Sequence, residues 1–283
     1  MRKSTWIRLT GIGIFTAAAW VAYTQGPQPT PVETLPITDG MYYIHNPEVP
    51  GNTTVLITDE GVLLVDDKFP QDGENIIAEV RKLTDAPIKY VVNTHHHGDH
   101  SGSNPTFQKE GAVIISSAKA RERMVAGKQA GPANFAFENR AHLYLGGEPI
   151  ELYQFGRAHT DGDAVVLFPR KRVLASGDIY ANDPGTPELV DYAGGGSATE
   201  WPNTLTKALH LEFDQVVPGH GTLASHADMA SFRDDTAELR RVIHQKLSQG
   251  ATRDDIEKYV RERFGFLDFH VNMSLDGLIK ELR

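Results

Sequence analysis

The chain has 283 residues, with 28 Lys and Arg against 37 Asp and Glu, and a formal net charge of −9 at pH 7. This length suits one large α/β domain with a sizeable core. An acidic chain without a basic stripe repels phosphate backbones, which argues against a nucleic-acid partner. The chain has no cysteine, which excludes disulfides and a lipid-modified cysteine.

The first 25 residues resemble an export signal. Residues 1–3 begin with a positive charge, and residues 9–22 are apolar or small. This run is shorter than the ~20 residues that span a bilayer, which favours a signal peptide, but a poor cleavage pattern leaves an uncleaved membrane anchor open. A Pro-rich linker is expected over residues 26–36. We therefore expect an exported protein, either periplasmic or tethered to a membrane of the cell envelope.

Short strands and one helix are expected after the linker. Runs of β-branched and aromatic residues predict strands at 41–44, 53–57, 62–65 and 88–93. Asp59–Gly61 supplies a tight reversal between two of them. Apolar residues at helical spacing predict a helix over residues 72–84, with Asp72 as its N-cap.

The most informative segment follows the strand at 88–93 and reads Asn-Thr-His-His-His-Gly-Asp-His-Ser over residues 93–101. Imidazoles and carboxylates are ligands that Zn²⁺ prefers. The candidate ligands in this segment are His95, His97, Asp99 and His100. They are too many for one tetrahedral ion that must also bind water, so the segment predicts half of a two-metal site. His96 is expected to pack or to line the rim.

Three further candidate ligands lie later in the chain. They are His159 in Gly-Arg-Ala-His-Thr-Asp-Gly-Asp, Asp178 in Ser-Gly-Asp, and His220 in Pro-Gly-His-Gly. Their glycine neighbours lack a Cβ, so the backbone can pass close to a crowded metal centre. Strands are expected here at 112–115, 164–168 and 172–175, and a helix at 199–211. Two sheets packed face to face with helices outside would account for this order.

Beyond residue 225 the sequence becomes helical. Apolar residues recur every three or four positions over residues 229–247, which predicts an amphipathic helix of about 20 residues that ends at Gly250. A second helix is expected over residues 252–264, because its first residues, Thr-Arg-Asp-Asp, have the pattern of a capping box. We expect a helical extension over residues 226–283 that packs on the catalytic domain.

The ordered motifs resemble those of the metallo-β-lactamase-fold hydrolase superfamily. His-x-His-x-Asp-His, a Gly-rich His segment, Ser-Gly-Asp and Pro-Gly-His-Gly occur in this order between about residues 40 and 223. The resemblance implies an α/β fold, a four-layer αββα sandwich of two mixed β-sheets flanked by helices, with a catalytic domain over residues 37–225. It also implies an enzyme that is a metal-dependent hydrolase.

Carried over position by position, the resemblance implies two sets of metal ligands. They are His95, His97 and His159 for one ion and Asp99, His100 and His220 for the other. Asp178 would bridge the two ions. The expected cofactor is a pair of Zn²⁺ ions, with iron or manganese as alternatives. Such ions, about 3.5–4 Å apart, would share a water and lower its pKa toward ~7, so that a bridging hydroxide is the nucleophile.

Other residues are expected to assist. Asp99 is the better candidate for handing a proton to the departing group. Asp66, after the strand at 62–65, is expected to accept the second N–H of a metal-bound histidine, with a plain turn carboxylate as the alternative. The Gly- and Pro-rich loops at 46–52 and 180–196 would set substrate choice. Candidate substrate contacts are Tyr180, Asn182 and Tyr192.

The residue at position 178 narrows the expected reaction. The best-known β-lactamases of this fold place Cys there or leave the bridge out, whereas a bridging Asp resembles members that cleave thioesters, lactones, phosphodiesters or related small esters and amides. A β-lactam carboxylate is commonly met by a cation, yet no Lys or Arg occurs over residues 173–206. Cations that could reach over from another loop are Arg121, Arg123 and Lys128.

The leading prediction is therefore a dinuclear zinc hydrolase of a small ester, lactone, thioester or amide. A true metallo-β-lactamase is the first alternative, and a non-catalytic, metal-stabilised binding protein of the envelope is the second. The expected partner is a small-molecule substrate, and the sequence carries no indication of an oligomeric state.

Overall fold

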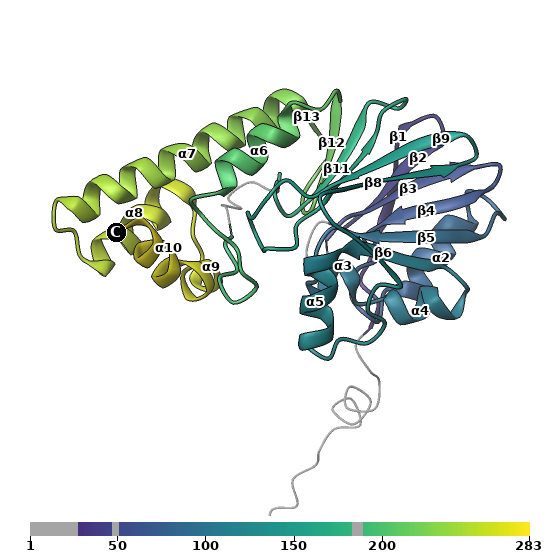
Figure 1. Ribbon diagram of the computed structural model, residues 1–283, viewed down its shortest axis with the longest axis horizontal. Helices are drawn as coiled ribbons and strands as arrows, with labels where there is room; N and C mark the ends of the chain where they lie inside the picture. The colour runs from purple at the N-terminus through teal and green to yellow at the C-terminus, as the bar shows by residue number, and fades with distance from the viewer. Residues whose placement is uncertain (1–27, 47–50, 183–188) are drawn as a thin grey trace, which may run out of the picture.

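The computed structural model describes residues 28–46, 51–182 and 189–283. Two β-sheets pack face to face there, and helices cover the outer face of each (Figure 1). The predicted four-layer sandwich of two mixed sheets flanked by helices is confirmed. The expected export segment at 1–25 lies outside the described residues, as do 47–50 and 183–188 of the two expected substrate loops. Across the described ranges, every helix is too short or too polar to cross a membrane.

The first sheet has seven strands, and its spatial order follows the chain. They are β1 (Glu33–Thr38), β2 (Met41–His45), β3 (Thr53–Thr58), β4 (Gly61–Val65), β5 (Ile88–Asn93), β6 (Val113–Ser117) and β7 (Phe135–Phe137). Strands β1 to β4 pair antiparallel, and β4 to β7 pair parallel.

The second sheet has six strands and is also mixed. In spatial order they are β13 (Ala224–Ser225), β12 (Gln215–Pro218), β11 (Val173–Gly177), β10 (Val165–Phe168), β9 (Glu148–Tyr153) and β8 (Arg140–Leu145). Only the β11–β12 pair in this sheet is parallel. Strands β1, β7, β8, β9, β12 and β13 were not predicted from the sequence.

Strand β4 shows how the sequence builds the layers. All of its residues are buried, as expected for a strand that is covered on both faces. Side chains alternate between the faces of a strand. Leu63 and Val65 therefore pack between the two sheets, while Val62 and Leu64 pack against the outer helices.

The helices form the two outer layers. They are α2 (Gly73–Arg81), α3 (Gly98–Ser101), α4 (Asn104–Lys109), α5 (Ala118–Ala126), α6 (Trp201–Leu209), α7 (His226–Ser248), α8 (Arg253–Phe264), α9 (Asp268–His270), the π-helix η1 (Val271–Leu275) and α10 (Asp276–Leu282). Apolar residues of α2 and α4 cover the first sheet. Residues of α6 and α7 cover the second sheet, and residues of α8 and α10 extend the same apolar cluster.

Three expectations about element ends need correction. Helix α2 has Asp72 at its N-cap position, but this carboxylate makes no capping hydrogen bond and instead accepts from the amide and hydroxyl of Thr30. The helix ends at Arg81 instead of residue 84, and the amide of Leu83 closes a tighter turn on the carbonyl of Val80. Strand β1 begins at Glu33, so the sheet starts inside the segment expected to be a linker.

The helices after residue 225 begin and end largely where capping chemistry predicts. Thr252 and Asp255 form the predicted capping box of α8, and Gly265 ends that helix in the left-handed conformation. Helix α7 starts at a second capping box, formed by Ser225 and Asp228, that was not predicted. Helix α7 packs on α6, and α10 packs on α7. Helix α7 thus contacts β12 and β13 directly, whereas α8 to α10 lie along the end of α7 that points away from the sheets (Figure 1).

Candidate metal centre

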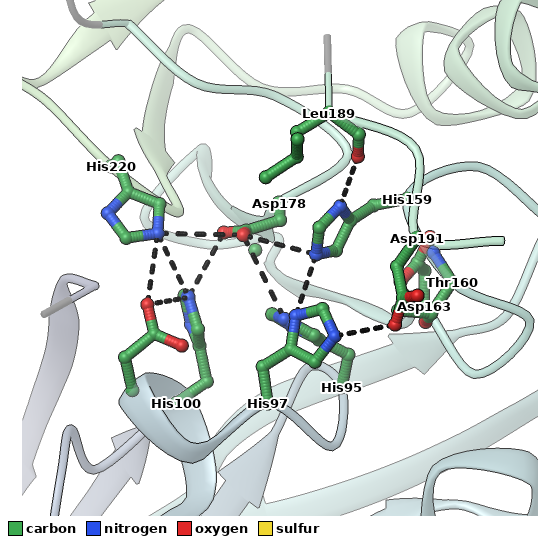
Figure 2. A network of polar contacts seen from close by, with 12 residues as sticks. His95, His97, His100, His159, Thr160, Asp163, Asp178, Leu189, Asp191 and His220 are labelled. Carbon is green, nitrogen blue, oxygen red and sulfur yellow. Dashed lines mark hydrogen bonds and ion pairs between the residues drawn. The ribbon is translucent and has the colours of Figure 1, made fainter. Parts of the chain in front are cut away.

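All seven predicted ligands lie beyond the ends of strands, in loops or on one short helix. Two of them, His95 and His97, follow β5, and the next two, Asp99 and His100, lie on the short helix α3. Asp178 directly follows β11, and His220 lies two residues beyond β12. Because β11 and β12 are parallel neighbours, their carboxyl ends meet at one edge of the sheet. His159, in the loop between β9 and β10, reaches the same place (Figure 2).

The first triad consists of His95, His97 and His159. Nδ1 of His97 lies 2.9 Å from Nε2 of His159. Oδ2 of Asp178 lies 3.4 Å from Nε2 of His159 and 3.8 Å from Nε2 of His95. One ligand atom from each of these four residues lies within 4.8 Å of the others, which is a group that could hold one metal ion.

The second triad consists of Asp99, His100 and His220. Nε2 of His220 lies 3.3 Å from Nε2 of His100 and 3.3 Å from Oδ2 of Asp99. Asp178 also faces this triad, with Oδ1 at 3.1 Å from Nε2 of His100 and Oδ2 at 3.5 Å from Nε2 of His220. Figure 2 shows Asp178 between the two triads.

The donor atoms suit zinc in kind and in spacing. Two nitrogen atoms bound to one tetrahedral Zn²⁺ at about 2.0–2.1 Å lie roughly 3.3 Å apart. The contacts within the triads, at 2.9 to 3.5 Å, are close to this value. Nε2 of His95 is buried and makes no hydrogen bond, although buried polar atoms nearly always have a partner. A metal ion would satisfy this nitrogen.

Each imidazole of the first triad is held through its other nitrogen. Nδ1 of His159 donates to the carbonyl of Leu189 at 2.5 Å, and Nε2 of His97 donates to Oδ2 of Asp191 at 2.9 Å. Nδ1 of His95 lies 3.1 Å from the hydroxyl of Thr94. Such outer partners fix the ring and the tautomer, and they leave the inward nitrogen free to bind a metal.

Asp66 holds His100 in the same manner. Its Oδ2 accepts from Nδ1 of His100 at 2.8 Å, and its two oxygens also accept from the amide and hydroxyl of Thr94 at 2.7 and 2.8 Å. Nε2 of His100 therefore faces the second triad. The geometry is the one expected for a carboxylate that orients a metal-binding histidine.

Two glycines let the backbone pass against the ligands. A Cβ on Gly51 would overlap the ring of His100, and a Cβ on Gly219 would overlap Oδ1 of Asp178. The carbonyl of Gly51 accepts from the buried ammonium of Lys68 at 2.5 Å. Burial lowers the pKa of Lys68 to about 7, despite the raising effect of nearby carboxylates. Lys68 thus ties the segment over His100 to the end of β4.

The two triads differ in charge. Burial lowers the pKa of His95 well below its usual range and that of His159 to about 4, so both imidazoles are neutral at pH 7. Burial acts in the same direction on His220, but the carboxylates of Asp178 and Asp99 raise its pKa to about 9. The same carboxylates raise the pKa of His100 well above its usual range.

The two carboxylates between these histidines are ionised. Burial would raise the pKa of Asp178 and of Asp99, but His100 and His220 hold both pKa values below the usual range. Without a metal the second triad therefore carries protons on its imidazoles, which a metal ion must displace.

A third group of candidate ligands lies beside the first triad. His96, His97 and Asp191 also place one ligand atom each within 4.8 Å of the others. This group shares His97 with the first triad and uses its outer nitrogen, which already donates to Asp191. The expected role of Asp191 is therefore to hold His97.

The three expected substrate contacts have other partners. Tyr180 is 2% exposed, and its ring packs against Phe232, so the expectation that it touches substrate needs correction. Asn182 donates from its side chain to the carbonyl of Thr222, and its amide donates to the carbonyl of His220. The hydroxyl of Tyr192 donates to the carboxylate of Glu281. Asn182 thus supports the backbone that carries a ligand.

Sequence reasoning missed several residues that support the ligands. They are Lys68, Asp163, Leu189 and Asp191. The carboxylate of Asp163 accepts from the amide and hydroxyl of Thr160, which fixes the turn after His159, and it stands in the motif that contains this histidine. Asp191 and the carbonyl of Leu189 left no signal, because they are far in sequence from the ligands that they hold.

The comparisons with known proteins agree with this fold and site. The family model for the metallo-beta-lactamase superfamily matches residues 46–220. The chain belongs to this superfamily, and it is a metal-dependent hydrolase by fold and family. The predicted family and enzyme class are thus confirmed, whereas the bridging-Asp subtype stays a prediction.

Curated relatives and solved structures give the same result. Metallo-beta-lactamase IND-1 of Chryseobacterium indologenes is 26% identical over 176 residues, 61% of this chain and 72% of that protein. Metallo-beta-lactamase type 2 of Elizabethkingia meningoseptica is 23% identical over 231 residues, 78% of this chain and 89% of that protein. A metallo-beta-lactamase from Pontibacter korlensis superposes with a TM-score of 0.66 and 21% identity, covering 72% of this chain and 99% of that chain.

Proposed function

We propose that the protein is a dinuclear zinc hydrolase that cleaves a small ester, lactone, thioester or amide. The observation that carries the proposal is the position of Asp178, whose oxygens face His95 and His159 on one side and His100 and His220 on the other. A carboxylate in this position can join two ions, and two ions suit a set of ligands that is too large for one.

In this proposal the first triad holds one ion, the second triad holds the other, and Asp178 contacts both. Bound zinc would supply Lewis acidity and lower the pKa of a water molecule toward ~7. The outer partners Asp66, Leu189 and Asp191 hold three of the imidazoles in one orientation. The ligands are thus fixed before substrate arrives, which reduces the reorganisation needed during the reaction.

We assign Asp99 a second role in proton transfer. Its Oδ2 lies 3.3 Å from Nε2 of His220 and 3.5 Å from Nε2 of His100, on the side of the second triad. Because its pKa lies below the usual range, the carboxylate is ionised at neutral pH and is a weak base. It would therefore hold a proton only in passing, between the attacking water and the departing group.

Two cations that the sequence offered for a substrate carboxylate are engaged elsewhere. Arg123 pairs with Asp161 at 2.6 Å and donates to the carbonyl of Ala193. Arg121 donates to the carbonyl of Ala133. The third cation, Lys128, is exposed. The engagement of the two arginines favours an uncharged acyl substrate, with Lys128 as the cation left to meet a carboxylate.

A β-lactam amide is the second candidate substrate. It is favoured by the curated relatives, which are themselves metallo-beta-lactamases. Both candidates require the same metal centre, so only turnover can separate them.

The test is a substrate panel with the zinc-loaded protein. Chromogenic esters, a lactone, a thioester and a chromogenic cephalosporin are each measured with and without a chelator, and metal content is determined by elemental analysis. We expect two zinc ions per chain and chelator-sensitive turnover of an ester, lactone or thioester. Turnover of the cephalosporin alone would favour the second candidate. Full metal loading with no turnover of any substrate would contradict the proposal and favour a metal-stabilised binding protein.

We also propose that the enzyme acts in the cell envelope, exported to the periplasm or anchored to a membrane. The support is the positive start of the chain and the apolar residues 9–22. Fractionation of cells that express the full chain, with the mass of the recovered protein, tests export and cleavage together. Recovery of the uncleaved protein with the soluble cytoplasmic fraction would contradict it.

A further inference from the structure

One short segment supports two ligands of the first triad. Residues 189–199, which we call the support segment, carry the carbonyl of Leu189 and the carboxylate of Asp191. These accept from His159 and His97 respectively (Figure 2). The amide of Asp191 also donates to the carbonyl of His159, so the support segment contacts this ligand twice.

The C-terminal helices hold the support segment at both of its ends. Near the first end, the hydroxyl of Ser274 in η1 donates to the carbonyl of Val190 and accepts from its amide, both at 3.0 Å. This side chain is buried. The two hydrogen bonds fix the backbone of the residue that lies between Leu189 and Asp191.

Near the other end, Glu281 of α10 gathers several donors of the support segment. Its carboxylate accepts from Tyr192 Oη at 2.8 Å, from Ser197 Oγ at 2.5 Å, and from the amides of Ala198 and Thr199 at 2.8 and 3.2 Å. Burial opposes ionisation, but these hydrogen bonds lower the pKa of Glu281, so it is a carboxylate at neutral pH. Gly277 lies so close to the Tyr192 ring that a Cβ there would overlap it.

Contacts from the sandwich reach the support segment as well. The carbonyl of Gly194 accepts from the amide of Asp161, and the amide of Ser197 donates to the carbonyl of Ala158. The segment therefore has an anchor on the sandwich, and the contribution of the C-terminal helices is to fix the conformation of its two ends.

We propose that the C-terminal helices are part of the metal centre in function, with Ser274 and Glu281 as positioning residues for His97 and His159. The inference rests on the proposed function, because it treats the first triad as metal ligands. The family match ends at residue 220, so the elements that supply both residues lie outside the matched segment. Outer partners of metal ligands typically change metal affinity about 10–100-fold when they are lost.

The experiment compares zinc affinities of the full-length variants Glu281→Gln and Ser274→Ala by competition with a chromophoric chelator. Gln keeps the shape of Glu281 but turns one acceptor into a donor that faces other donors. Asp191→Asn serves as the reference, because it removes the acceptor of His97 directly. We expect all three variants to lower the affinity for the same one of the two zinc ions. Glu281→Gln and Ser274→Ala should lower it by about tenfold, the lower end of the range for outer partners. The d–d absorption of the cobalt-loaded protein should change in the same variants.

The matched control is Glu257→Gln. Glu257 accepts hydrogen bonds from Arg253 and Arg261 within the C-terminal helices and does not contact the support segment. The Glu257→Gln variant should have a lower thermal stability and an unchanged affinity for both zinc ions. The double variant of Asp191→Asn and Glu281→Gln should be less than additive, because both changes act on His97.

The inference is overturned if Glu281→Gln and Ser274→Ala give the zinc affinities of Glu257→Gln. It is also overturned if these two variants lower the affinity for the other zinc ion, and not for the one that Asp191→Asn affects. A wild-type protein that binds a single ion would contradict the dinuclear proposal instead. The inference is then judged on the affinity for that ion in the same variants.

Discussion

The two triads around Asp178 are supported by different regions of the molecule. The second triad is held from the first sheet, by Asp66 after β4 and by Lys68 through the backbone of Gly51. Two members of the first triad, His97 and His159, are held from the support segment, which the C-terminal helices fix in turn, whereas His95 contacts Thr94 at the end of β5. The second triad thus draws support from the opening strands of the fold, and most of the first triad draws it from residues near the end of the chain.

The triads also differ in what metal binding must displace. His95 and His159 are neutral without a metal, so an ion can bind them without removing a proton. His100 and His220 hold protons beside Asp99 and Asp178. The comparison teaches that two adjacent sites with similar ligands can differ in their support and in their dependence on pH.

The change with the largest expected effect removes the residue that the triads share. Asp178→Asn should weaken the binding of both ions by more than about a hundredfold, since even outer partners cost about 10–100-fold, and hydrolysis should be lost with them. Metal content after dialysis and kcat/KM measure the two effects. Asp214→Asn, which removes an exposed partner of Arg172, is the matched control and should change neither. Loss of one ion alone would show that Asp178 is not shared.

A smaller and selective effect is expected from the outer carboxylates. Asp66→Asn should lower the affinity of the second triad for its ion, and Asp191→Asn should lower that of the first triad, each by about 10–100-fold. Each variant loses an acceptor that sets the tautomer of one imidazole. Stepwise zinc titration of both variants checks this. If the two variants weaken the same ion, the triads do not have separate supports.

The pH dependence of metal binding should separate the triads further. The pKa of His220 is raised to about 9 and that of His100 well above its usual range, so two protons must leave as an ion binds, and affinity for the second ion should rise by up to about a hundredfold per pH unit from pH 7 to 9. The pKa of His159, lowered to about 4, means that affinity for the first ion should change little there. Zinc titration in buffers of different ionisation enthalpy measures the released protons. Equal proton release for both ions would contradict the assignment of charge.

The smallest expected effect concerns a C-terminal contact far from the support segment. Thr252→Ala removes the N-cap of α8 and should lower the free energy of unfolding by about 1 kcal/mol. Because Thr252 does not touch the support segment, both zinc affinities should stay unchanged. Chemical denaturation and chelator competition measure the two quantities. A loss of metal affinity here would mean that stability alone, and not Ser274 and Glu281, links these helices to the site.

The difference between the triads also explains what the sequence could predict. His95, His97, Asp99 and His100 lie in one short motif, and Asp66 follows a strand with a clear pattern, so local reasoning found these ligands and the carboxylate partner of His100. The division of the ligands into two triads came from the family resemblance. The periodic helices and the capping box at Thr252 could be predicted because their patterns also lie within short stretches of the sequence. Strands β7 and β8 left weak patterns, because β7 covers only three residues and several side chains of both strands are exposed.

The supports of the first triad could not be predicted in this way. Leu189 acts through its backbone carbonyl, which no side chain marks. Asp191 meets His97 across 94 positions, and Glu281 meets Ser197 across 84. Contacts over such separations depend on how the second sheet and the C-terminal helices pack, which no local pattern encodes.

The most direct test of the account is the anomalous diffraction of crystals of the zinc-loaded protein at the zinc absorption edge. We expect two peaks, one within reach of His95, His97 and His159 and one within reach of Asp99, His100 and His220, with Asp178 contacting both. A single peak, or a peak held by His96 and Asp191 outside the first triad, would contradict the central claim that Asp178 joins two metal sites.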